Sequence, residues 1–254
     1  MKVARTPAEL GGGPRAVALG TFDGVHLGHR RVIETALSAG PEPTVVTFDP
    51  HPRTALGNRV ELLTSLERRL ELLEELGVEA TLVVEFTLDL ARLEPEEFAE
   101  EVLRPIGAEV VVAGEDFRFG RGRAGDMELL SRLGFETLPV PILDGVSSSR
   151  IRELLAEGDV EGAARLLGRP IAVEGTVVTG DARGGTLGFP TANLDVRPEL
   201  LVPANGIYAG AAGEHRAAVS IGTNPHYGGR ERRVEVHLLD FSGDLYGRQL
   251  VVEL

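Results

Sequence analysis

The sequence predicts an α/β protein of two domains, a parallel sheet wrapped by helices followed by a small antiparallel β-barrel. Three observations support this fold class. Apolar strands alternate with helical patterns over residues 1–168, the break GRP stands at 168–170, and the remaining segment is glycine-rich with short alternating strands. Strand-helix alternation is typical of parallel sheets, and evenly spaced short strands are typical of barrels. We therefore expect domains at 1–168 and 169–254.

Composition narrows the class of protein further. The 254 residues carry 26 Lys and Arg against 39 Asp and Glu, a net charge of −13, and no cysteine. A disulfide-stapled scaffold and a cysteine-ligated metal site are therefore excluded, and the acidic balance argues against general nucleic-acid binding. No apolar run reaches the roughly 20 residues of a membrane span. Because the N-terminus also lacks the apolar core of a signal peptide, we expect a cytoplasmic protein.

The first domain is predicted from short apolar strands and the helices between them. The helix at 62–76 is the clearest, because its leucines recur with a 3.6-residue period and Gly77 ends it. The strands are expected at 16–19, 44–48, 81–86 and 110–113, and the helices at 31–37, 62–76 and 94–103. In such sheets, ligands bind beyond the carboxyl ends of the strands.

Two short helices, at 151–155 and 160–167, lead to the second domain. The barrel strands are expected at 171–178, 206–210, 215–221, 234–241 and 249–254. Turn residues separate them, such as NG at 205–206 and SGD at 242–244. The near-regular spacing of these strands predicts an antiparallel barrel.

A glycine-rich turn, GTFDGVHLGH at 20–29, follows the first predicted strand and opens the first helix. In such a turn, backbone amides can approach a phosphate, and the helix N-terminus adds about half a positive charge. His26 and His29 flank Gly28, so both imidazoles can face that phosphate and stabilise a transition state. A chance pair or half of a metal site is the alternative on spacing alone. The strand-to-helix context favours the phosphate site.

Three further motifs lie in the first part of the chain. FDPHP at 48–52 closes a strand with two prolines and predicts a rigid binding loop, for which a plain stiff turn is the alternative. GEDFRFG at 114–120 sets two aromatic rings beside Arg118, which suits a planar ring and a phosphate, and ordinary core packing of both rings is the alternative. SSSRIR at 147–152 offers two arginines to a triphosphate, with a serine N-cap as the alternative.

HLGH at 26–29 resembles the H-x-G-H signature of the nucleotidylyltransferase superfamily, whose histidines stabilise a pentavalent phosphate during attack on the α-phosphorus of a nucleotide. Together with the three further motifs, in this order, it resembles the FMN adenylyltransferase module of bacterial bifunctional riboflavin kinase/FAD synthetase. Val146 and Ser149 depart mildly from the family's I-S-S-T-x-I-R. The resemblance implies a Rossmann-like nucleotidylyltransferase domain in which His26 and His29 are catalytic.

The same resemblance implies the residues of two substrate sites in this domain. The ATP and phosphate site would contain Gly20, Thr21, Phe22, Asp23, Gly28, Ser147, Ser148, Arg150 and Arg152. The flavin and nucleotide site would contain Phe48, Pro50, His51, Asp116, Phe117 and Arg118.

A second glycine-rich segment, GDARGGTLGFPTAN at 180–193, follows the first predicted barrel strand. In an extended segment Thr191 and Asn193 share a face, so their oxygens could meet one hard cation, and a loose loop is the alternative. The segment resembles the riboflavin kinase motif G-R-x-L-G-F-P-T-A-N, which implies that both residues hold Mg²⁺. Gly185 replaces the usual arginine, so we expect Arg183 to substitute or phosphate contact to weaken. The implied ATP-binding residues are Gly180, Gly184, Gly188 and Pro190.

The predicted strand at 234–241 places Glu235 and His237 on one face. Ionisable groups that point into a small barrel or its mouth indicate a function, because a carboxylate there can accept the proton of a primary alcohol during phosphoryl transfer. The resemblance assigns this base role to Glu235, and a surface glutamate is the alternative. The family continues past this chain's last residue into a C-terminal helix that helps enclose the flavin, so we expect either a truncated chain or a less closed kinase pocket.

The sequence therefore predicts an enzyme that phosphorylates riboflavin to FMN and then adenylylates FMN to FAD, with ATP as co-substrate and Mg²⁺ as cofactor. The expected partners are these small molecules, with weak self-association and without nucleic acid or membrane. A monofunctional FMN adenylyltransferase with an impaired, flavin-binding barrel is the main alternative. A flavin-sensing binding protein and a nucleotidylyltransferase for another substrate are weaker ones, because the motifs of both modules are present.

Overall fold

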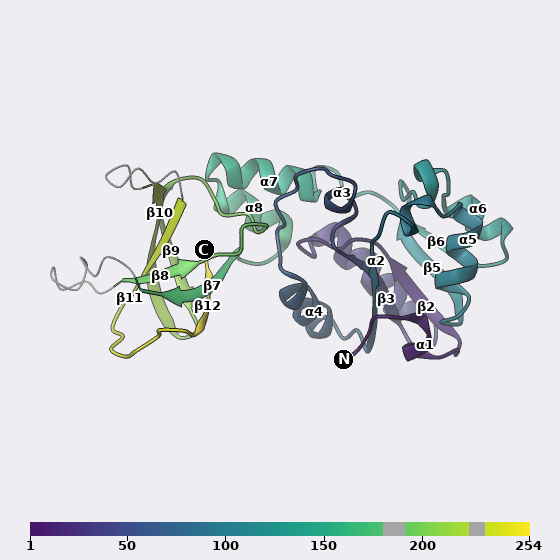
Figure 1. Cartoon of the computed structure of the whole chain (residues 1–254), viewed down its shortest axis with the longest axis horizontal. Coiled ribbons are helices and arrows are strands. Elements are labelled where there is room, and N and C mark those ends of the chain that lie inside the picture. Colours follow the sequence, from purple (N-terminus) through teal and green to yellow (C-terminus); the bar gives the residue numbers. More distant parts are fainter. Residues whose placement is uncertain (180–190, 224–231) are drawn as a thin grey trace. The chain divides into compact units, whose positions relative to one another are not determined.

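The computed structural model describes residues 1–179, 191–223 and 232–254 (Figure 1). These residues form two compact units, Met1–Ser147 and Ser148–Leu254. The first unit holds a parallel sheet and the second a closed barrel, so the predicted fold class is confirmed.

The first unit is built on a six-stranded sheet in the order β1-β4-β3-β2-β5-β6, with every neighbouring pair parallel. The strands are β1 Lys2–Ala4, β2 Arg15–Leu19, β3 Thr44–Asp49, β4 Ala80–Glu85, β5 Ala108–Gly114 and β6 Glu136–Val140. The α-helices are α1 Pro7–Leu10, α2 Leu27–Ala39, α3 Pro52–Ala55, α4 Leu66–Glu75, α5 Pro95–Phe98 and α6 Met127–Arg132. Single turns of other helix types are η1 Leu90–Arg92, η2 Ala99–Leu103 and η3 Arg121–Arg123.

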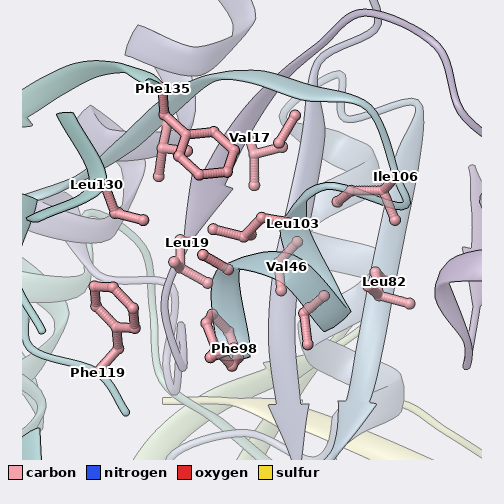
Figure 2. Close-up of a cluster of buried hydrophobic side chains, with 14 of the residues drawn as sticks. Val17, Leu19, Val46, Leu82, Phe98, Leu103, Ile106, Phe119, Leu130 and Phe135 are labelled. Carbon is pink, nitrogen blue, oxygen red and sulfur yellow. The ribbon is translucent and has the colours of Figure 1, made fainter. Parts of the chain in front are cut away.

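Both faces of this sheet are buried. Along β2, Val17 and Leu19 belong to one hydrophobic cluster, whereas Ala16 and Ala18 belong to a second. Figure 2 shows the first cluster, in which Phe98 of α5 packs against the strands. The second cluster packs α2 and α4 on the opposite face. Strands buried on both faces are continuous apolar runs, which is why the sequence predicts β2 to β5 well.

The strand order reverses at β2. The chain runs from β2 through β3 to β4 on one side and then crosses to β5 and β6 on the other. The loops that follow β2 and β5 therefore flank a topological switch point, where doubly wound sheets bind ligands. The motifs at 20–29 and 114–120 are these two loops, and the motif at 48–52 follows the neighbouring β3.

Several elements of the first unit were not predicted, namely the short helices α1, α3 and α6 and the edge strands β1 and β6. Of these strands, β1 has only three residues and β6 has a single buried position. The helix expected at 94–103 is α5 followed by the π-helical turn η2.

The second unit contains the closed barrel β10-β11-β8-β7-β12-β9, with all neighbouring strands antiparallel. Its strands are β7 Ala172–Val178, β8 Ala192–Asp195, β9 Gly206–Ala212, β10 His215–Thr223, β11 Arg232–Leu238 and β12 Gln249–Glu253. Five of them were predicted, and β8 was not. Where β9 meets β12, a Cβ on Gly210 would collide with the carbonyl oxygen of Glu253, so glycine lets the barrel close.

Two helices, α7 Ser148–Glu157 and α8 Val160–Leu167, belong to the same unit as the barrel. The backbone N–H of Ala204 donates to the carbonyl of Leu155 at 2.8 Å, which ties α7 to the segment before β9. The division expected near residue 168 follows the change from helices to strands, whereas the packing begins the second unit at Ser148. Within the described ranges, no helix is both long enough and apolar enough to cross a membrane.

Candidate active sites

The two histidines of the turn after β2 are stacked on each other. Their ring centroids are 3.5 Å apart and their planes differ by 15°. His26 is the N-cap of α2, and its Nδ1 accepts a hydrogen bond from the backbone N–H of His29 at 3.2 Å. Because Nδ1 is the acceptor, a neutral His26 carries its proton on Nε2. The pair therefore presents an N–H donor beside the positive end of the α2 dipole.

Glycine and a phenylalanine shape the space around this pair. A Cβ on Gly28 would lie 3.2 Å from Cε1 and 3.3 Å from Nδ1 of His26, so a side chain at position 28 would press on the imidazole. Phe22 is buried and meets the His29 ring edge-on, with centroids 5.3 Å apart. Gly20 lies against the Phe22 ring, which would be 3.0 Å from a Cβ at position 20. Gly28 thus makes room for one histidine and Phe22 supports the other.

Asp23 anchors the turn from beneath. Its carboxylate is almost fully buried, and Oδ1 accepts from the backbone N–H of Leu63 at 2.9 Å and of Thr64 at 3.2 Å. The hydroxyl of Thr64 in turn accepts from the N–H of Gly24 at 3.1 Å. These bonds fix the turn to the segment before α4. The contact of Asp23 with ATP phosphates stays a prediction.

His29 lies in an environment that disfavours the imidazolium. Burial lowers the pKa of His29 well below its usual value of 6.5, and the positive charges of His26 and Arg69 lower it further. Its Nδ1 is buried and has no hydrogen-bond partner among the described residues. At neutral pH this histidine is therefore uncharged, so it can act as a hydrogen-bond donor but not as a cation.

Arg69 of α4 also reaches this edge of the sheet. It belongs to none of the sequence motifs and was not predicted as a site residue. Its Nη1 donates to the carbonyl of Thr21 at 3.1 Å, the hydroxyl of Thr47 at 3.1 Å and the carbonyl of Phe48 at 3.0 Å. The side chain is only 1% exposed. The available signal was its position three residues from both Leu66 and Leu72, on the apolar stripe of a helix.

The loop after β3 is held by local contacts. Phe48 is buried against Phe86 and Phe98, at centroid distances of 5.7 Å and 6.3 Å. His51 is the N-cap of α3, and its Nδ1 accepts from the N–H of Arg53 at 3.1 Å. Pro50 is exposed and follows a cis peptide bond. Core packing and capping thus shape this loop, and its contact with a flavin or nucleotide stays a prediction.

In the loop after β5, the two aromatic rings differ in their exposure. Phe119 is buried in the core, where it packs on Phe98 at 5.5 Å. Phe117 is half-buried and stacks on Phe119 at 5.9 Å with an interplanar angle of 16°. Asp116 and Arg118 are exposed. Phe119 is therefore a core residue, whereas Phe117 has a partly exposed ring with charged groups beside it.

The serine-arginine segment lies at the start of the second unit. Ser147 ends the first unit, and Ser148 begins α7. Arg150 is exposed and forms an ion pair with Glu153 at 2.9 Å on the same helix. Arg152 is half-buried. The assignment of this segment to ATP phosphates stays a prediction.

In the barrel, the unpredicted strand β8 brings two predicted residues together. Asn193 of β8 is directly opposite Glu235 of β11 in the antiparallel pairing. Cβ atoms of such pairs are typically about 5 Å apart. Thr191 is exposed and immediately precedes β8. The ATP-binding candidates Gly180, Gly184, Gly188 and Pro190 lie outside the described residues.

The structure decides which face of β11 carries Glu235, a question that the sequence left open. Val234 and Val236 are buried in the barrel interior, so Glu235 and His237, which alternate with them, lie on the outer face. A closed six-stranded barrel fills its interior with apolar side chains and leaves no room there for a carboxylate. Asn193 alternates in the same way with the buried Leu194. The candidate kinase site is therefore on the outside of the barrel wall.

The donor atoms at this outer site are oxygens. No group of three or more His, Cys, Asp or Glu residues that could hold a metal ion occurs in the part of the chain that the structure describes. The Thr191 hydroxyl, the Asn193 amide and the Glu235 carboxylate are hard oxygen donors, which Mg²⁺ prefers. Thr191 and Asn193 therefore fit a cation that arrives with nucleotide phosphates better than a permanently bound transition metal.

Known proteins resemble both units. The FAD synthetase family matches residues 12–150, and the riboflavin kinase family matches residues 167–254. A bifunctional riboflavin kinase/FMN adenylyltransferase from Listeria monocytogenes is 39% identical, covering 94% of this chain and 82% of its own length. The Bacillus subtilis protein of the same name is 38% identical, covering 93% and 82%.

A solved structure has the same fold over nearly the whole chain. The crystal structure titled a macrolide-efflux protein from Streptococcus pneumoniae superposes with a TM-score of 0.87 at 32% identity, covering 99% of this chain and 88% of that one. Both family matches occur in this chain, in the order of its two units. This chain belongs to the family of bifunctional riboflavin kinases/FMN adenylyltransferases.

Proposed function

We propose that this enzyme uses its barrel to phosphorylate riboflavin to FMN and its first unit to adenylylate FMN to FAD, with ATP as the second substrate of both steps. The observation that carries the proposal is the stacked pair of His26 and His29 at the N-terminus of α2, beside the switch point of the sheet. Family membership of both units supports it.

In adenylyl transfer, an oxygen of the FMN phosphate attacks the α-phosphorus of ATP. A new P–O bond forms, the bond between the α-phosphorus and the bridging oxygen breaks, and pyrophosphate leaves. Negative charge grows on the equatorial oxygens of the pentavalent phosphorus. His26 and the neutral His29 donate N–H groups to these oxygens, and the α2 dipole adds to their effect. The phosphate nucleophile is already ionised, so this step needs no general base.

In the kinase step, Glu235 accepts the proton of the riboflavin 5′-hydroxyl as its oxygen attacks the γ-phosphorus of ATP. ADP leaves and the product is FMN. A carboxylate is suited to this role because it is ionised at neutral pH and accepts hydrogen bonds only. Positioning and charge neutralisation account for most of the rate enhancement in phosphoryl transfer.

Thr191 and Asn193 are the residues that we propose hold Mg²⁺ with the ATP phosphates in the kinase step. Bound Mg²⁺ neutralises phosphate charge. Asn193 faces Glu235 across the pairing of β8 and β11, so the residues assigned to the cation and to the base lie side by side. The glycines at 180, 184 and 188 and Pro190 are proposed to cover the phosphates.

The substrate sites of the first unit are proposed on the loops already described. ATP phosphates would contact residues 20–23 and Gly28 of this unit. The family resemblance also assigns the serine-arginine segment at 147–152 to ATP phosphates. The isoalloxazine or adenine ring would meet the loops at 48–52 and 114–118, where Phe117 offers a partly open face. Because ATP is required in both steps, we place the enzyme in the cytoplasm.

A chromatographic time course tests this function. One reaction starts from riboflavin with Mg²⁺ and ATP, a second starts from FMN, and riboflavin, FMN and FAD are quantified in both. We expect FMN and then FAD from riboflavin. FAD from the FMN-fed reaction alone would instead indicate the monofunctional enzyme. The replacement of the usual arginine by Gly185 would then be the first explanation to test. No product in either reaction would contradict both activities.

A further inference from the structure

One buried cation lies beneath the adenylyl-transfer site without belonging to any motif of the sequence. The side chain of Arg69, on α4, donates hydrogen bonds both to the turn after β2 and to the end of β3. Its acceptors are the carbonyl of Thr21 in the histidine turn, and the Thr47 hydroxyl and Phe48 carbonyl on β3. The Thr47 hydroxyl itself donates to the Thr21 carbonyl at 2.9 Å, which closes the network.

We propose that Arg69 is a positioning residue for adenylyl transfer, which locks the histidine turn onto the end of β3. This inference rests on the proposed function of the site. The turn carries His26 and His29, and the end of β3 opens the 48–52 loop assigned to the flavin or nucleotide. A cross-link between these two segments sets the distance between the groups that stabilise the transition state and the groups that hold a substrate.

Arg69 is a buried cation whose charge is only partly compensated by nearby carboxylates. The side chain is 1% exposed, and its Nε has no hydrogen-bond partner among the described residues. Burial lowers the pKa of Arg69, and the carboxylates of Asp23, Asp49 and Glu67 act against this shift. A buried cation is expensive unless it is well bonded. Retaining one here points to a function at the edge of the sheet.

A second effect of Arg69 is electrostatic. Its positive charge is one of the causes that lower the pKa of His29, after burial and the charge of His26. Arg69 thus contributes to keeping His29 neutral, while its hydrogen bonds keep the turn in place. Loss of the Arg69 charge should change the titration of His29, whereas loss of its hydrogen bonds should change the rate of FAD formation.

The contact geometry makes an unusual prediction about lysine. All three hydrogen bonds come from one nitrogen, Nη1, which carries only two hydrogens. A lysine ammonium carries three donors on one nitrogen and retains the charge, so with a small shift that makes up for its shorter side chain it can satisfy all three acceptors. It also removes the unpartnered Nε. Arg69→Lys should therefore preserve the site, although arginine and lysine are usually not interchangeable.

The test compares full-length variants in FMN-fed and riboflavin-fed reactions. Arg69→Met removes the charge and the donors but keeps an unbranched side chain, Arg69→Lys keeps the charge and the donors, and Arg68→Met is the matched control. Arg68 is the neighbouring residue and bonds only to Glu71 and Glu75 on its own helix in the described contacts. We expect Arg69→Met to lower kcat for FAD formation about 100-fold, the loss typical of a misplaced catalytic group. FMN formation should stay unchanged in all three.

Two further measurements separate positioning from general damage. The imidazole titration of His29, followed by NMR, should move to higher pH in Arg69→Met and stay in place in Arg69→Lys and Arg68→Met. If Arg69→Met does not fold, Thr47→Val tests the same network, because it removes the bridging hydroxyl without removing volume. We expect Thr47→Val to lower FAD formation about 10-fold with little change in the KM for ATP.

The outcomes distinguish this inference from the proposed function. If the unchanged enzyme makes no FAD, or if His29→Ala makes it normally, the proposed function fails. If the unchanged enzyme makes FAD and Arg69→Met does so within about threefold, Arg69 has no positioning role. Equal loss in Arg69→Lys and Arg69→Met, or an unaffected Thr47→Val, would overturn the hydrogen-bond argument.

Discussion

The two candidate sites of this enzyme are built in opposite ways. In the first unit, the reactive histidines lie on a turn anchored by the buried side chains of Asp23 and Arg69. In the barrel, Glu235 and Asn193 lie on the outer face, held side by side by strand pairing alone. The positions of the proposed catalytic groups thus depend on core packing in the first unit and on backbone hydrogen bonds between strands in the barrel. Substitutions should expose this difference.

The largest expected effect is the separation of the two activities by His29→Ala. It removes a donor to the α-phosphate in the transition state, so FAD formation from FMN should fall about 100- to 1,000-fold. FMN formation from riboflavin should be unchanged. Both rates are measured on one preparation by chromatography, so each serves as the folding control for the other. Equal loss of both products would mean that the sites are not separate.

The converse substitution is Glu235→Gln. It replaces the proposed base with an isosteric amide that cannot take a proton, so FMN formation should fall about 100- to 10,000-fold. Because Glu235 lies on the outer face of the barrel, the protein should retain its thermal stability. The same preparation, supplied with FMN, should still yield FAD. If Glu235→Gln still phosphorylated riboflavin at the full rate, Glu235 would be a surface glutamate and not the base.

A smaller effect concerns stability rather than rate. Asp23→Ala leaves the N–H groups of Leu63 and Thr64 buried without their acceptor, which should lower the free energy of unfolding by about 3 kcal/mol. Asn193→Ala, on the outer face of the barrel, should change it by less than about 0.5 kcal/mol. Urea denaturation followed by far-UV circular dichroism measures both.

Tyrosine fluorescence can assign that loss to one unit. The chain has three tyrosines, all beyond residue 207, and no tryptophan. Asp23→Ala should therefore shift the dichroism transition more than the fluorescence transition. If Asn193→Ala lowered the free energy of unfolding as much as Asp23→Ala, the two sites would not differ in their coupling to core packing.

The smallest expected effect is a pH dependence of stability in the first unit. The folded-state pKa of His29 lies below its unfolded value of 6.5, so below that pH the unfolded chain binds a proton that the folded chain does not. Stability should therefore fall as the pH drops below 6.5, by at most about 1.4 kcal/mol per pH unit. His29→Gln should flatten this slope relative to the unchanged protein. An identical slope in both proteins would contradict the shift.

The parts of the fold that were predictable are those encoded locally. The apolar runs of β2 to β5 and the period of α4 were visible in the sequence, as were His26, His29, Glu235 and Asn193 within their motifs. The strand β8 was missed because its four residues follow a glycine-rich segment and contain only one buried side chain. The sequence left open whether Glu235 points into the barrel, lies at its mouth or lies on its surface, because alternation identifies a shared face but not which face is inside.

By itself, the sequence determined the two-domain α/β class, the order of the motifs and the chemical groups available at each site. Local period, turn chemistry and spacing carry that information. Only the tertiary structure decided the stacking of His26 on His29, the pairing of Asn193 with Glu235 and the reach of Arg69 from α4 to β3. These contacts join residues through strand order and packing, which depend on the whole chain. Long-range pairing is settled by the collective burial of both sheet faces, and a linear motif does not record it.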